Sequence, residues 1–391
     1  MHVPGSRTTR HLLKRFVTWP LIDALNNRAT LRRCSPDQAQ SARPPRSPRP
    51  ALTLLEWARI ISELSERGGG FFSDNLVSNE SSYLQVVQDL ERVPKGLAYI
   101  GVGPEQSFSY VATLEPSLAL VVDCRRDNLT LHLFYKALFE ETSTRAEWLS
   151  LLLGSELEPL PDAGDAAALE AVLASVERSR SDNSAFARAH ARIRGRLERL
   201  NGLLSRAPDW RALKRIHQRF CRERLGITFQ LHKLGRHTYP TLSSLLLARA
   251  PDGRALSFMA TAERFARVRD LQREHRIVPV VGDFTGYRAF KGIAELLGQR
   301  GLSVGVVYAS NVEQMVWEQR RWRHWIRNMR TLPFAPEALV VRCYIDQGRA
   351  HPRQLPGHRT TTLVQSARGF LEQQQHRPCR DHWDVVAERK A

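Results

Sequence analysis

The sequence lacks long apolar stretches, paired cysteines and familiar metal-binding motifs. No hydrophobic run approaches the roughly 20 residues of a membrane-spanning helix, so we expect no transmembrane segment. The 5 cysteines are scattered without a Cys-x-x-Cys pair, and no His-Glu-x-x-His occurs, which argues against a disulfide framework and a zinc site. The N-terminus also lacks the apolar core of a secretory signal. These absences favour a cytoplasmic protein in a reducing compartment.

Lysine is also scarce, whereas arginine is abundant, and the 391-residue chain carries a formal net charge of +18. Such a charge is typical of proteins that bind nucleic acid or acidic lipid. An arginine-rich genome would produce it as well, so charge alone does not identify a partner. The apolar content of 42% suffices for a large core. We therefore expect either one large α/β domain with an insertion or two domains.

The first 50 residues differ from the rest in composition. They carry ten Arg or Lys residues against two Asp, and residues 41–50 form a proline-rich linker that holds neither a helix nor a sheet ladder. We expect residues 1–50 to be a disordered basic leader. Two alternatives stay open, namely a short basic amphipathic helix at 12–25 with a targeting or membrane-surface role, and a start codon assigned too far upstream.

The most informative stretch is residues 97–129. A short apolar run ends in Gly101-x-Gly103, about three helical turns follow, and a second apolar run ends in Asp123. This order predicts a nucleotide-binding βαβ unit, because the glycines let the backbone approach a ligand and the carboxylate accepts hydrogen bonds from both ribose hydroxyls. Gln106 stands where a dinucleotide-binding motif has its third glycine.

Helical periodicity dominates residues 140–275, which we expect to form a long insertion between the second and third strands. Within it, residues 188–224 hold twelve Arg or Lys residues against three acids. Such a block could bind the phosphates of RNA or of a phosphorylated ligand. A solvated helix face is the commoner explanation, because few aromatic residues lie between the arginines to stack on bases.

Strand patterns return at 277–286 and 303–308. Asp283 follows the first of these and could accept a hydrogen bond from an exocyclic amine such as that of adenine, with the Phe284 ring stacked on the base. Asn311 follows the second strand, where the reacting end of a ligand would lie. The structural alternatives are a turn carboxylate bonded to its own backbone for Asp283 and a helix N-cap for Asn311.

The polar loop at residues 71–84 precedes the first strand. Its polar side chains outnumber what a helix cap requires: Asp74, Asn75, Ser78, Asn79 and Glu80. We therefore consider a ligand-covering loop alongside a cap. Because ligands of open parallel sheets bind outside the carboxyl ends of the strands, we expect the glycine turn and the polar strand ends to converge.

The predicted fold is α/β, with a doubly wound and mostly parallel sheet. Its N-terminal helices and first half occupy 51–139, and its second half occupies 276–345 and ends in a strand at 338–345. Residues 346–391 are predicted to be a basic C-terminal extension, irregular apart from a short helix near 362–373.

The order and spacing of these motifs resemble the class I S-adenosylmethionine-dependent methyltransferase domain. Four strings resemble more specifically a largely uncharacterised bacterial family with that fold: Ser73-Asp-Asn-Leu-Val-Ser-Asn-Glu80, Tyr99-Ile-Gly-Val-Gly-Pro-Glu-Gln106, Val278-Pro-Val-Val-Gly-Asp-Phe284 and Tyr308-Ala-Ser-Asn-Val-Glu-Gln314. The resemblance covers residues 52–345.

This resemblance implies S-adenosylmethionine as the cofactor and methyl transfer to an unknown acceptor. It places the cofactor at Gly101, Gly103, Asp123, Asp283 and Phe284, and catalysis at Asn311. The acid that usually precedes the glycine motif is absent, so Glu80 or Glu105 would supply the carboxylate for the ammonium of the cofactor. No Asn-Pro-Pro-Tyr motif follows the fourth strand, so methylation of nucleic-acid bases is not implied.

Two other functions stay open at this point. A non-catalytic module of the same fold would bind RNA or a phosphorylated ligand through the basic insertion. A nicotinamide-dependent oxidoreductase would use the same first βαβ unit, but Gln106 and the lack of a Tyr-x-x-x-Lys pair argue against it. The sequence indicates neither the methyl acceptor nor the oligomeric state.

Overall fold

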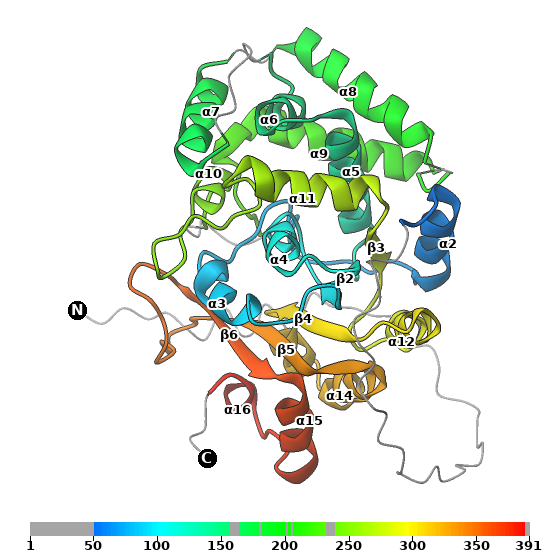
Figure 1. Cartoon of the computed structure of the whole chain (residues 1–391), viewed down its shortest axis with the longest axis vertical. Coiled ribbons are helices and arrows are strands. Elements are labelled where there is room, and N and C mark those ends of the chain that lie inside the picture. The colour runs from blue at the N-terminus through cyan, green and yellow to red at the C-terminus, as the bar shows by residue number, and fades with distance from the viewer. Residues whose placement is uncertain are drawn as a thin grey trace. The chain divides into compact units, whose positions relative to one another are not determined.

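A six-stranded sheet organises the protein. The structure, a computed structural model, describes residues 51–156, 164–179, 182–200, 202–204, 206–231 and 239–387. The predicted leader at 1–50 lies outside these residues. Within them the strand order is β3-β2-β1-β4-β5-β6 (Figure 1).

Five strands of the sheet run parallel, and β6 pairs antiparallel with β5 at one edge. The mixed α/β class with a mostly parallel sheet, predicted from the sequence, is therefore confirmed. The strands are β1 Ala98–Gly101, β2 Leu118–Asp123, β3 Ile277–Val281, β4 Val304–Ser310, β5 Phe334–Ile345 and β6 Thr360–Ser366.

The central strands form because helices cover both faces of their apolar runs. Every residue of β1, β2 and β3 is buried, as is typical of parallel strands between two helical layers. Packing is close where β3 ends, since a Cβ at Gly282 would collide with Ala289 and Val122. The strand ends are therefore held in fixed positions.

The path of the chain reverses between β1 and β4. From β1 it moves through β2 to β3 at one edge and then crosses to β4 on the other side of β1. Right-handed crossovers consequently place the helices of the two halves on opposite faces, and ligands of open α/β sheets bind at such a reversal. The ends of β1 and β4 are thus the expected ligand position.

Two groups of helices cover the sheet. In one group α11 contacts both α4 and α5, and in the other α12 contacts both α2 and α14. Trp325 and Met329 of α14 are fully buried, so this helix turns its aromatic side toward the core. The bounds are α2 Leu54–Leu64, α4 Gln106–Leu114, α5 Arg126–Glu141, α11 Ala262–Arg273, α12 Arg288–Arg300 and α14 Trp322–Thr331.

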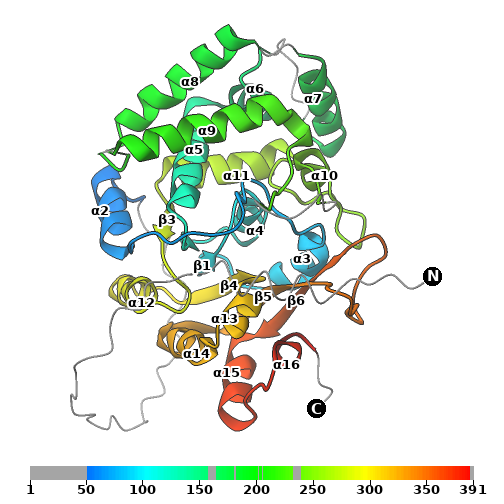
Figure 2. The same ribbon diagram turned by 180° about the vertical axis from the view of Figure 1, so that it is seen from behind.

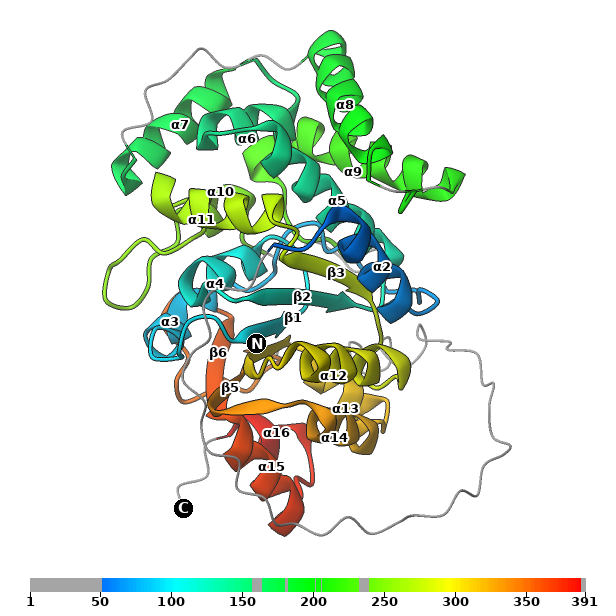
Figure 3. The same cartoon turned by 45° about the vertical axis from the view of Figure 1, so that its right-hand side comes forward.

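Further helices follow α5 before the chain reaches β3. In Figures 1 and 2, α6 to α9 lie beyond the β3 edge, at the opposite end from α15 and α16. Figure 3 shows α2 beside β3, which it contacts. None of the helices in the described ranges is long and apolar enough to cross a membrane. The bounds are α6 Arg145–Leu153, α7 Ala166–Arg178, α8 Asn183–Glu198, α9 Ala207–Glu223, η2 Arg224–Gly226 and α10 Leu242–Leu246.

The C-terminal segment differs from the sequence prediction. The residues predicted as a helix near 362–373 begin as β6, and α15 starts only at Ala367. The threonines of β6 are buried, and two of them bond to a hydroxyl group, with Ser82 Oγ lying 2.8 Å from Thr360 Oγ1 and 3.0 Å from Thr362 Oγ1. Residues 346–391 therefore supply part of the sheet. The remaining elements are η1 Tyr83–Val86, α3 Val87–Leu90, α13 Val312–Glu318, α15 Ala367–His376 and α16 His382–Val386.

Candidate functional site

The turn after β1 holds the two glycines that the sequence singled out. A Cβ at Gly101 would collide with the ring and hydroxyl of Tyr99, so Gly101 makes room for that ring, whereas we had expected room for a ligand. Gly103 adopts φ +86°, which favours glycine, and an added Cβ would meet no atom within 4 Å. Burial lowers the pKa of His132 to about 4, so its neutral ring donates from Nε2 to the Gly103 carbonyl at 2.8 Å and holds the turn.

Asp123 ends β2 as predicted, but its carboxylate already has an internal partner. The Arg125 guanidinium donates from Nε to Oδ1 at 3.0 Å and from Nη2 to Oδ2 at 2.6 Å. Both side chains are buried, and Arg125 also donates from Nη1 to the Asp74 carbonyl at 2.7 Å. A ribose at Asp123 would have to share the carboxylate with Arg125 or displace it.

Asp283 and Phe284, which follow β3, are also engaged within the protein. Asp283 Oδ1 accepts hydrogen bonds at 2.9 Å from the N–H and the hydroxyl of the residue two positions later, and Oδ2 accepts one from Arg321 Nη1 at 2.8 Å. This is the turn carboxylate that the sequence left open. The buried Phe284 ring packs against Phe290 and Trp325, with centroids 5.2 and 5.1 Å away. In this structure it is a core residue, and it does not offer the ring face for stacking that we had expected.

The start of α4 presents two buried polar side chains, those of Glu105 and Gln106. The Ser78 N–H donates to Glu105 Oε1 at 3.2 Å, and its hydroxyl donates to Gln106 Oε1 at 2.8 Å. Tyr308 on β4 donates to the same Gln106 oxygen at 2.9 Å. Glu105 Oε2 and Gln106 Nε2 have no hydrogen-bond partner in the described part of the chain. An acceptor and a donor on adjacent residues are therefore unsatisfied next to the Gly103 turn.

Glu80, from the loop before β1, meets the end of β4. Its Oε1 accepts a hydrogen bond from the Ser310 hydroxyl, while its Oε2 has no partner in the ranges described. Ser310 adopts φ +52°, a conformation that costs a non-glycine residue roughly 1–2 kcal/mol and is typical of functional sites. Asn311 holds the N-cap position of α13 without a side-chain cap bond, and its Oδ1 lies 3.3 Å from Ser310 Oγ.

Burial raises the pKa of Glu80 and of Glu105 to about 7. Only neutral groups bond to these two carboxylates, whose exposed fractions are 1% and 2%. Every other buried carboxylate in the described ranges pairs with an arginine: Asp123, Asp209, Glu313 and Asp384. Glu80 and Glu105 are thus the two buried acids of this part of the chain without a cation.

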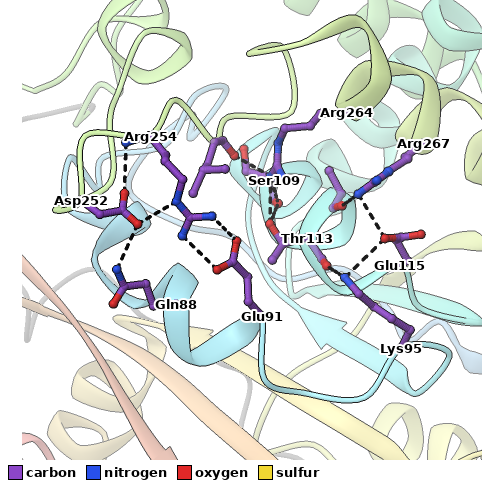
Figure 4. A network of polar contacts seen from close by, with 12 residues as sticks. Gln88, Glu91, Lys95, Ser109, Thr113, Glu115, Asp252, Arg254, Arg264 and Arg267 are labelled. Carbon is purple, nitrogen blue, oxygen red and sulfur yellow. Dashed lines mark hydrogen bonds and ion pairs between the residues drawn. The ribbon is translucent and has the colours of Figure 1, made fainter. Parts of the chain in front are cut away.

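A buried arginine fixes the insertion to the site, as Figure 4 shows. Arg264 of α11 donates from Nη2 to the Ser109 carbonyl at 3.0 Å and to Thr113 Oγ1 at 2.8 Å, both on α4. Nearby, Arg254 forms two hydrogen bonds with Glu91, at 2.7 and 2.9 Å. Because α4 carries the unsatisfied pair at its start, the position of that pair depends on the insertion.

Ion pairs engage most of the cations in the basic block at 188–224, and six of these cations pair with acids outside the block. At least nine of its twelve cations form ion pairs with carboxylates. Arg192 pairs with Glu141 at 2.8 Å and Arg196 with Glu140 at 2.6 Å, both partners belonging to α5. The local charge count in the sequence could not include these distant acids. The structure thus favours a solvated helix face over a phosphate-binding surface.

The structure brings some of the predicted residues together and separates others. Glu80, Glu105 and Asn311 gather where β1 and β4 end, whereas the two predicted aspartates lie beyond β2 and β3. Sequence reasoning missed the parts of Gln106 and Ser310. In the sequence, Gln106 stands out only because it replaces a glycine. The available signal for Ser310 is its position directly between a strand and a helix.

A domain family described as a domain of unknown function, DUF7790, matches residues 75–209 and 222–391. The matched ranges include all six strands and most of the insertion. No curated protein matches the sequence. Because the match spans well over half of the chain, the chain belongs to the DUF7790 family.

Proposed function

We propose that the chain binds S-adenosylmethionine where β1 and β4 end and is a methyltransferase-like protein. The order β3-β2-β1-β4-β5, with its reversal between β1 and β4, is that of nucleotide-binding doubly wound sheets. Dinucleotide-binding domains add a second complete βαβαβ half. Here β6 runs antiparallel to β5, which favours a ligand with a single nucleoside.

The observation that carries the proposal is the unsatisfied pair at the start of α4. Glu105 Oε2 lacks a donor and Gln106 Nε2 lacks an acceptor. An α-amino-acid group supplies both, since its ammonium donates and its carboxylate accepts. S-adenosylmethionine joins such a group to a nucleoside, so Glu105 and Gln106 would hold its methionine end beside the Gly103 turn.

Asp123 and Asp283 would hold the nucleoside. Each carboxylate oxygen can accept more than one hydrogen bond, so Asp123 can serve ribose hydroxyls while it keeps bonds from Arg125. The bound cofactor would supply a methyl group that is already activated by the sulfonium. The chain would then contribute mainly by positioning the acceptor near Asn311.

Isothermal titration calorimetry with S-adenosylmethionine and S-adenosylhomocysteine tests the proposal. We expect both to bind, and Glu105→Gln to weaken binding about tenfold or more, since a hydrogen bond to a charged group contributes about 1.5–3 kcal/mol. Glu63→Gln is the matched control, because Glu63 forms an exposed ion pair with Arg59 on α2. Absence of binding at about 1 mM ligand, or equal binding by the Glu105 variant, would contradict the proposal.

The competing function is a non-catalytic module that binds RNA through the basic insertion. Titration with RNA at low and high salt would then show salt-dependent binding, and the titration with S-adenosylmethionine would show none. The ion pairs of residues 188–224 make this outcome the less expected one.

A further inference from the structure

Among the buried carboxylates of the described ranges, Glu80 alone has neither a cation nor a proposed contact with the cofactor. Its Oε1 accepts from the Ser310 hydroxyl, and its Oε2 is unsatisfied within the described residues. The groups that face it, Ser310, Tyr308 and Cys343, are hydroxyls and a thiol. A carboxylate that is removed from water without a cation is costly, and the described residues supply no positive partner for the ionised form of Glu80.

Two features indicate that a ligand can reach this carboxylate. Ser310 and Asn311 are only partly buried, so the end of β4 remains accessible. Ser310 also holds its left-handed conformation at that position and directs its hydroxyl to Glu80. The strained backbone at Ser310 therefore joins an accessible strand end to a buried acid. Such strain is typical of sites whose geometry is fixed before a ligand binds.

The acceptors near the end of β4 match a compact ammonium. An ammonium has three N–H donors and no acceptor. Glu80 Oε2, Ser310 Oγ and Asn311 Oδ1 are three acceptors, and the last two lie 3.3 Å apart. A metal ion fits less well, because no group of three or more His, Cys, Asp or Glu side chains in the described ranges could hold one.

We infer that the methyl acceptor is an amine, and that Glu80 binds its ammonium form with the help of Ser310 and Asn311. This inference rests on the proposed function and names the substrate class for the same site. Glu105 and Glu80 then have different partners, since the first faces the ammonium of the cofactor and the second faces that of the acceptor.

Glu80 would also take the proton that the reaction releases. The ammonium must lose one proton before its nitrogen has a lone pair, and Glu80 accepts that proton and later passes it to solvent. The nitrogen then forms a bond to the methyl carbon while the carbon–sulfur bond breaks and its electron pair stays on sulfur. Burial raises the pKa of Glu80 to about 7, which suits a group that exchanges a proton near neutral pH.

Calorimetric titration of the full chain, saturated with S-adenosylhomocysteine, tests this inference with two probes of similar shape. n-Butylamine carries an ammonium, and n-butanol does not. We expect butylamine to bind the wild type at least tenfold more tightly than Glu80→Gln, with butanol binding weakly and equally to both. Glu63→Gln is the control and should match the wild type. In buffers of different ionisation enthalpy at about pH 6, amine binding should release up to one proton, because Glu80 must ionise.

The outcomes separate the two proposals. If S-adenosylhomocysteine does not bind, the proposed function fails. If it binds but butylamine does not, or butylamine binds the Glu80 variant as tightly as the wild type, the inference fails while the proposed function stands. Should Glu80→Gln not fold, Ser310→Ala replaces it, with an expected loss of three- to tenfold in amine affinity. An unchanged affinity in that variant overturns the inference.

Discussion

The acids at the ends of β2 and β3 have arginine partners, whereas those near the ends of β1 and β4 have none among the described residues. Asp123 and Asp283 accept hydrogen bonds from the guanidinium groups of Arg125 and Arg321. Glu105, which follows β1, and Glu80, which comes from the loop before β1 and meets the end of β4, receive hydrogen bonds only from neutral groups. The charges of Asp123 and Asp283 are thus balanced by arginines, whereas no described residue balances the charges of Glu105 and Glu80. This difference teaches that a carboxylate without a protein cation marks the position of a charged ligand group here, whereas a carboxylate that already has an arginine partner can serve only neutral groups such as ribose hydroxyls.

The largest expected effect concerns the ion pair between Asp123 and Arg125 at the end of β2. Arg125→Met removes the cation from buried Asp123 and should lower the free energy of unfolding by about 3–5 kcal/mol, as measured by urea denaturation. Adding Asp123→Asn to this variant should restore most of the loss, because no unpaired charge then remains. Arg59→Met, at an exposed ion pair, serves as the control. A loss below about 1 kcal/mol in Arg125→Met would remove the contrast between the two ends.

Removal of the Glu80 charge should have the opposite effect on the free energy of unfolding. Burial raises the Glu80 pKa from 4.5 to about 7, so the folded state binds more protons than the unfolded state between these values. The contribution of Glu80 to stability is thus full below about pH 4.5 and is lost as pH rises through about 7. Glu80→Gln should therefore stabilise the protein near pH 8 by up to about 3 kcal/mol, and should have little effect near pH 4.5.

Denaturation of both proteins across this pH range measures that effect. Tyr308 and Cys343, which face Glu80, stay neutral throughout because burial raises the pKa of each well above its ordinary value. The difference between wild type and variant then reports Glu80 itself. A variant that is less stable than the wild type near pH 8 would show that the ionised carboxylate has an internal partner after all.

A smaller effect is expected at Asp283. Asp283→Asn keeps an oxygen for the turn but weakens the ion pair with Arg321, whose side chain is 30% exposed. We expect a loss of about 1 kcal/mol, measured as a lower midpoint of thermal unfolding. A loss as large as that of the Arg125 variant would mean that solvent weakens the Asp283–Arg321 pair no more than it weakens the Asp123–Arg125 pair.

The smallest effect is expected in the insertion. Arg194 and Glu198 of α8 form an exposed pair, and Glu198→Gln, which leaves the contact of Arg194 with the Trp210 ring in place, should change the free energy of unfolding by less than about 0.5 kcal/mol. Urea denaturation at low and high salt measures it. A change above about 1 kcal/mol would show that these surface pairs support the fold as the buried pairs do.

The sequence predicted the parallel part of the fold because its apolar runs end at glycines, at acids or, for β4, at Ser310 and Asn311. It did not predict β6, since a strand that buries threonine hydroxyls against Ser82 lacks the apolar pattern of the others. At the site, carboxylates after strands could be located from the sequence. Whether each one has a cation could not, because Arg321 reaches Asp283 from a distant part of the chain.

The attachment of α11 to α4 has a consequence for how this family can vary. Excision of residues 145–273 would remove Arg264, so the buried hydroxyl of Thr113 would lose the guanidinium that donates to it, and the Ser109 carbonyl would keep only the Thr113 hydroxyl as a side-chain donor. The insertion is therefore a structural part of the domain. Family members with a shorter insertion must replace the donor or change the acceptor, so residues 113 and 264 should vary together during evolution.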